Sequence, residues 1–229
     1  MPETSAIDLV LSADPGLLAI VRLSLTVSLS AVFFAAVIGL PLGALLALTR
    51  FPGRPFTVVM LNALMGLPPV VVGLAIYLLL SRSGPLGRFG LLFTPQAMIV
   101  AQAVLVTPII AALARQTIED LWSEYREEFA AMNVGPLGRI ATLMWDARFS
   151  LVTALLAGFG RAAAEVGAVI IVGGNIDGFT RTMTTAIALE TSKGDLPLAM
   201  GLGLVLIVIV IAVNALAWGV GRIGERFAG

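Results

Sequence analysis

Residues 17–48 read LLAIVRLSLTVSLSAVFFAAVIGLPLGALLAL, an apolar run in which Arg22 is the one charged residue. A helix that crosses about 30 Å of hydrocarbon needs about 20 such residues. At about 1.5 Å per residue this run is longer than the hydrocarbon core, so we expect its helix to tilt, to kink near Pro41 or to project beyond the membrane. The run therefore predicts a membrane-spanning helix.

Four more apolar runs are long enough to cross a bilayer. With the first run, the expected spans cover residues 17–48, 57–80, 95–114, 150–173 and 196–218. The chain is 59% hydrophobic and 12% charged, whereas soluble domains average roughly 45–50% and 25%. We therefore expect an all-α integral membrane protein in which residues 1–229 form one domain with five transmembrane helices.

The second run contains GLPPVVVG at residues 66–73. Pro68 and Pro69 remove two backbone N–H donors, so the helix is expected to break there. Within a membrane such a break is tolerated only inside protein or beside a water-filled path. Both prolines are therefore candidate residues of a path through the membrane.

Residues 115–149 form the one markedly polar stretch between spans. Asn133 and Gly135-Pro136 supply a stop and a new start, so two short helices are expected there. An apolar stripe at spacings of three and four makes the first helix amphipathic. The stripe consists of Ile118, Leu121, Trp122, Tyr125 and Phe129. On periodicity alone, a helix lying at the membrane surface is an equal alternative.

Arginine placement predicts the orientation of the chain. Arginines are more frequent after the first span, in the 115–149 segment and after the fifth span than in the other loops. The positive-inside rule places these segments in the cytoplasm. With five spans, the N-terminus is then outside and the C-terminus is cytoplasmic.

Glu165 lies inside the fourth expected span, and Arg161 lies one turn earlier. Ionisable groups at that depth are costly, so they usually face a path or the helix bundle and find partners. A pair beside a path that acts in gating and a structural ion pair between helices are equally good interpretations.

Residues 173–185, GGNIDGFTRTMTT, combine flexible backbone, neutral hydrogen-bond donors and one cation. Such a set could handle an oxyanion. The alternative from composition is a solvated outer loop that leads into a short amphipathic helix. The candidate path residues here are Gly173, Gly174, Asn175, Thr180, Arg181, Thr182, Thr184 and Thr185.

Glycines inside the expected spans have a simpler interpretation. Small residues allow neighbouring helices to approach closely in membranes. We expect contacts of this kind at Gly73, Gly158, Gly160 and Gly167.

Composition excludes several functions. Lys and Arg number 14, as do Asp and Glu, so no basic field suggests a nucleic acid partner. The chain has no Cys and no His, which removes thiolate and imidazole metal sites and the commonest general base. No nucleophile-base pair, acidic metal cage or GxxxxGK[ST] phosphate loop is present. We expect neither a catalytic nor a metal site, and an intramembrane hydrolase or a channel has no supporting motif.

Several segments resemble the inner-membrane permease subunits of bacterial ABC importers for molybdate, sulfate and tungstate. GLPPVVVG, with EVGA and GGNI at residues 165–168 and 173–176, is typical of this oxyanion group. TRTMTTAIALETSKGD at residues 180–195 is closest to tungstate permeases. The similarity covers residues 17–218 and implies the fold of a type I importer permease.

The resemblance extends to the cytoplasmic segment that couples such permeases to their ATPases, with the pattern E-A-A-x-x-x-G. Ala130, Ala131 and Gly135 match the pattern, whereas Phe129 stands at the Glu position, directly after Glu127 and Glu128. Residues 145–148, WDAR, replace the usual I-x-L-P. These six matched or neighbouring residues are the candidate ATPase contacts.

The resemblance implies a multi-pass homodimer in the bacterial cytoplasmic membrane. Two cytoplasmic ABC ATPase subunits and an extracytoplasmic oxyanion-binding protein would be its partners. This chain would bind no cofactor and would not be an enzyme, because ATP and Mg belong to the ATPase. A molybdate or sulfate permease is the alternative within the family, and a stand-alone secondary transporter or channel is the alternative outside it.

Overall fold

The computed structural model describes residues 15–228, without the side chains of residues 217 and 220–228. All its regular elements in this range are helices, which confirms the expected all-α fold. The first is α2 (Pro15–Leu48), which matches the run at residues 17–48 and continues through Pro41 without interruption. Its backbone lies very close to that of α5 (Pro95–Ala131), since a Cβ atom at Gly43 would be 2.5 Å from the Ala111 carbonyl oxygen.

The second run is broken at the prolines, as expected. It forms α3 (Arg54–Met65) and α4 (Pro69–Leu80), which meet at an angle of 97°. Pro68 is extended, with φ −63° and ψ 121°, because the proline that follows it disfavours the helical conformation. Pro69 then opens α4 at a position where its missing N–H costs nothing.

The third run forms a helix that extends beyond the expected end at residue 114. Helix α5 continues without a break through the first half of the polar segment, so the expected separate short helix there is wrong. No glycine or proline interrupts residues 115–131, and a change from apolar to polar residues does not end a helix. The second expected helix is present as α6 (Pro136–Asp146), with Pro136 in its first turn.

The fourth run is also interrupted, which the sequence did not predict. It forms α7 (Arg148–Ala163) and the short α8 (Gly167–Gly173), with Glu165 between them. Helix α9 (Met183–Lys193) follows and ends at Gly194, which has φ 85°. Helix α10 (Leu196–Ala228) then contains the fifth expected span.

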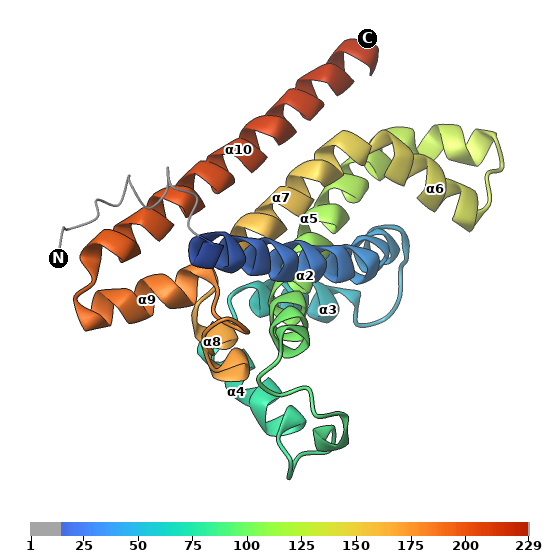
Figure 1. The fold of residues 1–229 in the computed structure, drawn as a ribbon. Coiled ribbons are helices and arrows are strands. Elements are labelled where there is room, and N and C mark those ends of the chain that lie inside the picture. Colours follow the sequence, from blue (N-terminus) through green and yellow to red (C-terminus); the bar gives the residue numbers. More distant parts are fainter. Residues whose placement is uncertain (1–14, 229) are drawn as a thin grey trace.

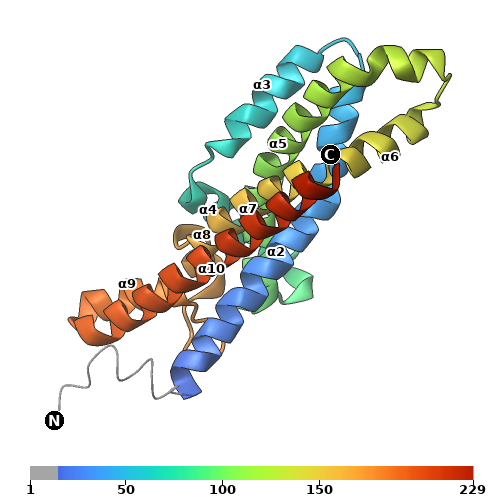
Figure 2. The ribbon, with the colours of Figure 1, turned by 90° about the horizontal axis from the view of Figure 1, so that it is seen from above.

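Figures 1 and 2 show α2 crossing α5 and α7 near the middle of the molecule, with α9 and α10 side by side along one flank. A short 3-10 helix, η1 (Gly87–Phe89), lies in the loop between α4 and α5. Buried apolar residues of α2, α4, α5 and α8 form one core cluster.

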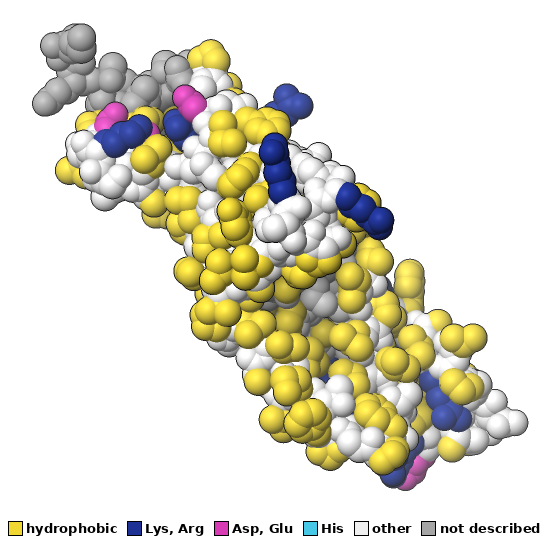
Figure 3. All heavy atoms as spheres, turned by 90° about the horizontal axis from the view of Figure 1, so that it is seen from below, with side chains coloured by type: hydrophobic (Ala, Val, Ile, Leu, Met, Phe, Trp, Pro, Cys, Tyr) yellow, Lys and Arg dark blue, Asp and Glu magenta, His cyan; other side chains and the backbone are white. Residues whose placement is uncertain are grey.

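Hydrophobic side chains also cover the outer surface. Figure 3 shows them over the middle of one face, with Lys and Arg nearer the two ends. Within the described residues, three helices are long and apolar enough to cross a membrane, or up to five spans result if each bent helix pair counts as one. A hydrophobic exterior of this kind is suited to lipid.

Candidate functional site

The beginnings of two half-helices, α4 and α8, lie against each other. A Cβ atom at Gly73 would be 2.7 Å from the Cα atom of Ala168, and one at Gly167 would be 2.8 Å from Val70 Cγ2. The break at Pro68-Pro69 and the break at residues 164–166 are therefore neighbours. Polar backbone groups at such breaks are tolerated at membrane depth only where protein or a water-filled cavity surrounds them.

Glu165 occupies the second break and is 3% exposed. Its Oε1 accepts a hydrogen bond from the Ala168 N–H at 3.0 Å, so the carboxylate stabilises the positive N-terminus of α8. Its Oε2 pairs with Arg161 Nη1, as the spacing predicted. Arg161 is 29% exposed, so its charge reaches the surface while that of Glu165 does not.

Threonines at the start of α9 bond to this break. The Thr184 hydroxyl donates to the Glu165 carbonyl oxygen at 2.8 Å. Thr182 and Thr185 form a capping box, in which the Thr182 N–H donates to Thr185 Oγ1 at 3.0 Å. Both are buried. The expected short helix is present and the loop before it is exposed at residues 176–179, whereas Thr182 and Thr185 are buried rather than solvated.

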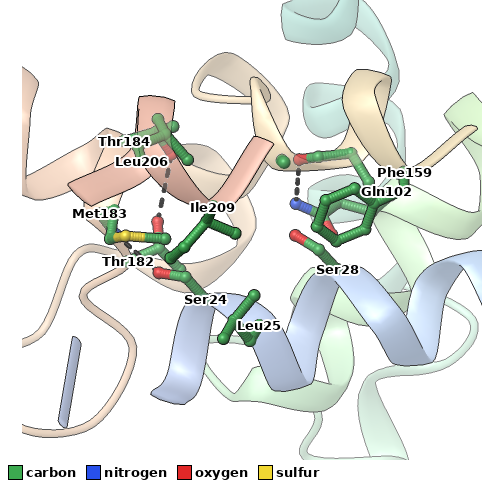
Figure 4. Close-up of a pocket in the computed structure, with 12 residues that line it drawn as sticks. Ser24, Leu25, Ser28, Gln102, Phe159, Thr182, Met183, Thr184, Leu206 and Ile209 are labelled. Carbon is green, nitrogen blue, oxygen red and sulfur yellow. Dashed lines mark hydrogen bonds between the residues drawn. The ribbon is translucent and has the colours of Figure 1, made fainter. Parts of the chain in front are cut away.

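A small pocket lined by both polar and apolar residues lies beside the threonines (Figure 4). Ser24 and Ser28 of α2, Gln102 of α5 and Thr182 are among its lining residues. Gln102 Nε2 donates to the Ala162 carbonyl oxygen at 3.0 Å, whereas the buried Oε1 has no partner in the described residues. The cavity measures about 10 Å³, close to the space of one water molecule.

Sequence reasoning missed Ser24, Ser28 and Gln102. Ser24 Oγ accepts the Met183 N–H at 2.7 Å and so ties the start of α9 to α2. An amide inside an apolar span is a usable signal, because polar side chains in membranes usually seek partners on other helices. Isolated serines carry no such signal, since they also occur as small contact residues.

The loop after α8 is folded back on itself. Gly174 and Asn175 have φ values of 73° and 50°. The Thr180 hydroxyl donates to the Gly173 carbonyl oxygen at 2.6 Å, and Asn175 Nδ2 donates to the Thr185 carbonyl oxygen at 3.4 Å. Arg181 pairs with Asp177 at 2.9 Å. The loop residues and the α9 threonines thus belong to one connected polar region.

The candidate coupling segment forms a separate site at the α5–α6 corner. Phe129 is 8% exposed, stacks on Trp122 and packs with Leu143. Phe129 therefore belongs to the core of this corner, and its expected contact with an ATPase stays a prediction. The remaining candidates are on the surface, namely Glu127, Glu128, Ala130, Ala131 and Gly135.

Among the described residues, no group of three or more Asp or Glu side chains could hold a metal ion. The expected contact glycines are confirmed at Gly73, Gly158 and Gly167, where a Cβ atom would be within 3 Å of a neighbouring atom. Gly160 is different, because a Cβ atom there would meet nothing within 4 Å.

Taken together, broken helices, a hydrophobic exterior and a projecting polar helical corner indicate a polytopic membrane protein. Residues 39–226 match the family of binding-protein-dependent transport system inner membrane components. The chain belongs to this family, as the resemblance of its motifs indicated.

Two relatives and one solved structure are similar over most of the chain. A probable anion ABC transporter permease protein of Haloferax volcanii is 42% identical over 205 residues, which cover 87% of this chain and 88% of the relative. The tungstate uptake system permease protein TupB of Peptoclostridium acidaminophilum is 40% identical over 214 residues, covering 93% and 94%. A chain of the MetNI methionine ABC transporter has the same fold, with a TM-score of 0.74 and 21% identity, covering 90% of this chain and 94% of that chain.

Proposed function

We propose that this chain is the permease subunit of an ATP-driven importer of tungstate. The observation that carries the proposal is 40% identity to a tungstate permease over 93% of this chain. In the proposed complex the chain forms a homodimer, binds two cytoplasmic ABC ATPases and receives the anion from an extracytoplasmic binding protein. ATP and Mg belong to the ATPases, and this chain lines the path and transmits movement.

The polar region around the two helix breaks supports a path for a dianion. Moving a dianion through a low-dielectric region is costly unless donors replace its water, and an excess of fixed cations would hold it too tightly. The neighbourhood of the breaks is rich in hydroxyls and amides, and its buried carboxylate is paired with Arg161. Neutral donors are therefore the main candidates for the path.

In the described conformation most of these donors are occupied by partners within the chain. The hydroxyls of Thr180, Thr182 and Thr184 are all hydrogen-bonded to neighbouring groups. A cavity of about 10 Å³ is also too small for a tetrahedral oxyanion. We infer that Pro68, Pro69 and the segment 173–185 lie near the two-fold axis, and that the path opens only when the broken helices separate.

The exposed residues of the α5–α6 corner are the proposed ATPase contacts. Ala130, Ala131 and Gly135 are small and exposed, so a partner surface can approach the backbone closely. Phe129 supports this surface from below by packing on Trp122. Because the proposed ATPases are cytoplasmic, the corner that binds them is also cytoplasmic. With five spans, the C-terminus is then on the cytoplasmic side and the N-terminus is outside.

Anion uptake by cells that lack and then regain this gene tests the substrate. We expect restored uptake of tungstate at concentrations where sulfate does not compete. Equal restoration of molybdate or sulfate uptake would assign the alternative substrate within the family. Restored uptake that persists without any ABC ATPase would instead support a stand-alone transporter or channel.

A further inference from the structure

Arg54, Arg115 and Glu119 form an ion cluster where α3 begins beside α5. Glu119 Oε1 binds Arg54 Nη2, and Glu119 Oε2 binds Arg115 Nη1. Arg54 Nε also donates to the Leu46 carbonyl oxygen at 2.9 Å, near the end of α2. Each arginine is therefore held in a fixed direction by the one carboxylate between them.

The position of the cluster along α5 places it at a membrane boundary. Arg115 follows Pro95, the first residue of α5, by about 20 residues, which corresponds to about 30 Å of helix. That distance matches the thickness of the hydrocarbon core. Helix α2 ends at Leu48 and α3 begins at Arg54, so the loop between them lies at the same boundary.

The cluster has hydrogen-bond donors that the protein leaves free. Two guanidinium groups face one carboxylate, so the cluster carries one net positive charge. A guanidinium offers five N–H donors, and the side chains of Arg54 and Arg115 are 28% and 16% exposed, whereas Arg115 Nε is buried without a partner in the described residues. An anion with several oxygens on one centre is the natural partner for guanidinium groups fixed in this way.

Two large apolar side chains close to Arg54 in the sequence are exposed. Phe51 and Phe56, on either side of Arg54, are 39% and 69% exposed. Arg50 is also exposed in the same loop. A ligand that suits both features has a phosphate group and hydrocarbon chains, and basic pockets between helices at the cytoplasmic boundary bind such headgroups.

We propose that Arg54 and Arg115 form a binding site for the phosphate of an anionic phospholipid. Glu119 holds the two guanidinium groups apart and leaves their remaining N–H donors for the headgroup, while Phe51 and Phe56 contact the acyl chains. The site is independent of the transported anion. A free phosphate ion shares the headgroup chemistry but would gain nothing from the exposed aromatic rings.

Native mass spectrometry of the full chain in its complex, released from nanodiscs, tests the site. The discs contain phosphatidylglycerol and phosphatidylcholine in equal amounts, and the readout is the ratio of the two lipids retained. We expect Arg54→Gln combined with Arg115→Gln to reduce the preference for phosphatidylglycerol about tenfold, through the loss of two charge-assisted contacts. The matched control is Arg88→Gln, because Arg88 contacts Phe89 in the loop before α5 and makes no ion pair in the described residues.

The Glu119→Gln variant is expected to change phosphatidylglycerol retention in the opposite direction. A rise in retention cannot result from a folding defect. Removal of the carboxylate frees more donors and raises the net charge, so phosphatidylglycerol retention should rise above that of the unchanged chain. An unchanged lipid ratio in the double arginine variant, or an equal loss in Arg88→Gln, would overturn the proposal. Displacement of phosphatidylglycerol by millimolar inorganic phosphate would assign the site to a soluble anion instead.

Discussion

Glu165 places a negative charge at the N-terminus of α8, and Arg161 balances it from one turn earlier in α7. The pair differs from a surface ion pair because the carboxylate is almost wholly buried. Loss of one partner from such a pair leaves an uncompensated charge, which costs more than the pair itself contributes. The backbone at the helix break depends on this carboxylate, since Oε1 binds the Ala168 N–H.

A double-mutant cycle measures this dependence. Because Arg161 is partly exposed whereas Glu165 is buried, we expect Arg161→Ala to destabilise the chain by about 1–2 kcal/mol and Glu165→Ala by somewhat more. The double variant should cost at least about 1 kcal/mol less than the sum of the two. Unfolding of the purified complex in detergent gives the values. Small, additive losses would mean that the two side chains act independently.

At the scale of elements, the close contact between α4 and α8 depends on a glycine. A Cβ atom at Gly73 would be 2.7 Å from the Cα atom of Ala168 and 3.2 Å from its carbonyl oxygen. Backbone atoms cannot rotate away as a flexible side chain can, so the two half-helices would have to move apart. The close approach of the two helix breaks therefore depends on the absence of a side chain at this one position.

Gly73→Ala is expected to destabilise the chain by about 1–3 kcal/mol, the usual cost of overpacking, and to reduce anion uptake. Gly160→Ala in α7 is the matched control, since a Cβ atom there meets nothing within 4 Å. It should leave stability unchanged or raise it by up to about 1 kcal/mol, because alanine is the better helix former. Thermal unfolding compares the two, and equal losses would contradict the close α4–α8 contact.

The α5–α6 corner allows a second comparison at this scale. A side chain at Gly135 would meet nothing within 4 Å, so Gly135→Arg should fold normally but block an approaching ATPase. We expect the variant to lose most of the ATP hydrolysis that the intact complex shows. Ser123→Arg, at an exposed position earlier in α5, is the control and should retain hydrolysis. Full ATP hydrolysis with Gly135→Arg would show that this corner is not part of the ATPase interface.

Much of the helical order was predictable from the sequence. The long helices α2 and α10 follow from hydropathy, and the break before α4 follows from the lost N–H groups of Pro68 and Pro69. The break at residues 164–166 was not predictable, because AAAEVGA contains no proline and the bend depends on bonds from Gln102 and Thr184 on other elements. The true end of α5 was missed because hydropathy indicates depth in the membrane rather than helix length.

The candidate site was predictable only in part. The Arg161–Glu165 pair follows from helical spacing, and the threonine-rich segment was identified by composition. The burial of Thr182 and Thr185 could not be foreseen, since it results from the packing of α9 on α2 through Ser24 and Met183. The same limit applies to Phe129, whose burial depends on α6 folding back onto α5.

At the scale of the whole molecule, the proposed orientation has a direct test. The chain has no Cys, so single Cys probes can replace Ser83 and Ser123, which are both exposed. Ser83 follows α4 and Ser123 lies in the polar part of α5, so we expect an impermeant thiol reagent to label Ser83→Cys from outside. Ser123→Cys should react only after the membrane is opened. Equal labelling of both in intact cells would contradict the five-span arrangement.

ATP hydrolysis by the reconstituted complex tests the proposed function most directly. The permease would be assembled with its ATPase in vesicles, and its binding protein would be added with tungstate, molybdate or sulfate. We expect tungstate to stimulate hydrolysis at a far lower concentration than sulfate, because the family and the relatives indicate a permease that serves an oxyanion-binding protein. Equal stimulation by sulfate or by an amino acid, or no response to any of the three anions, would contradict the proposal.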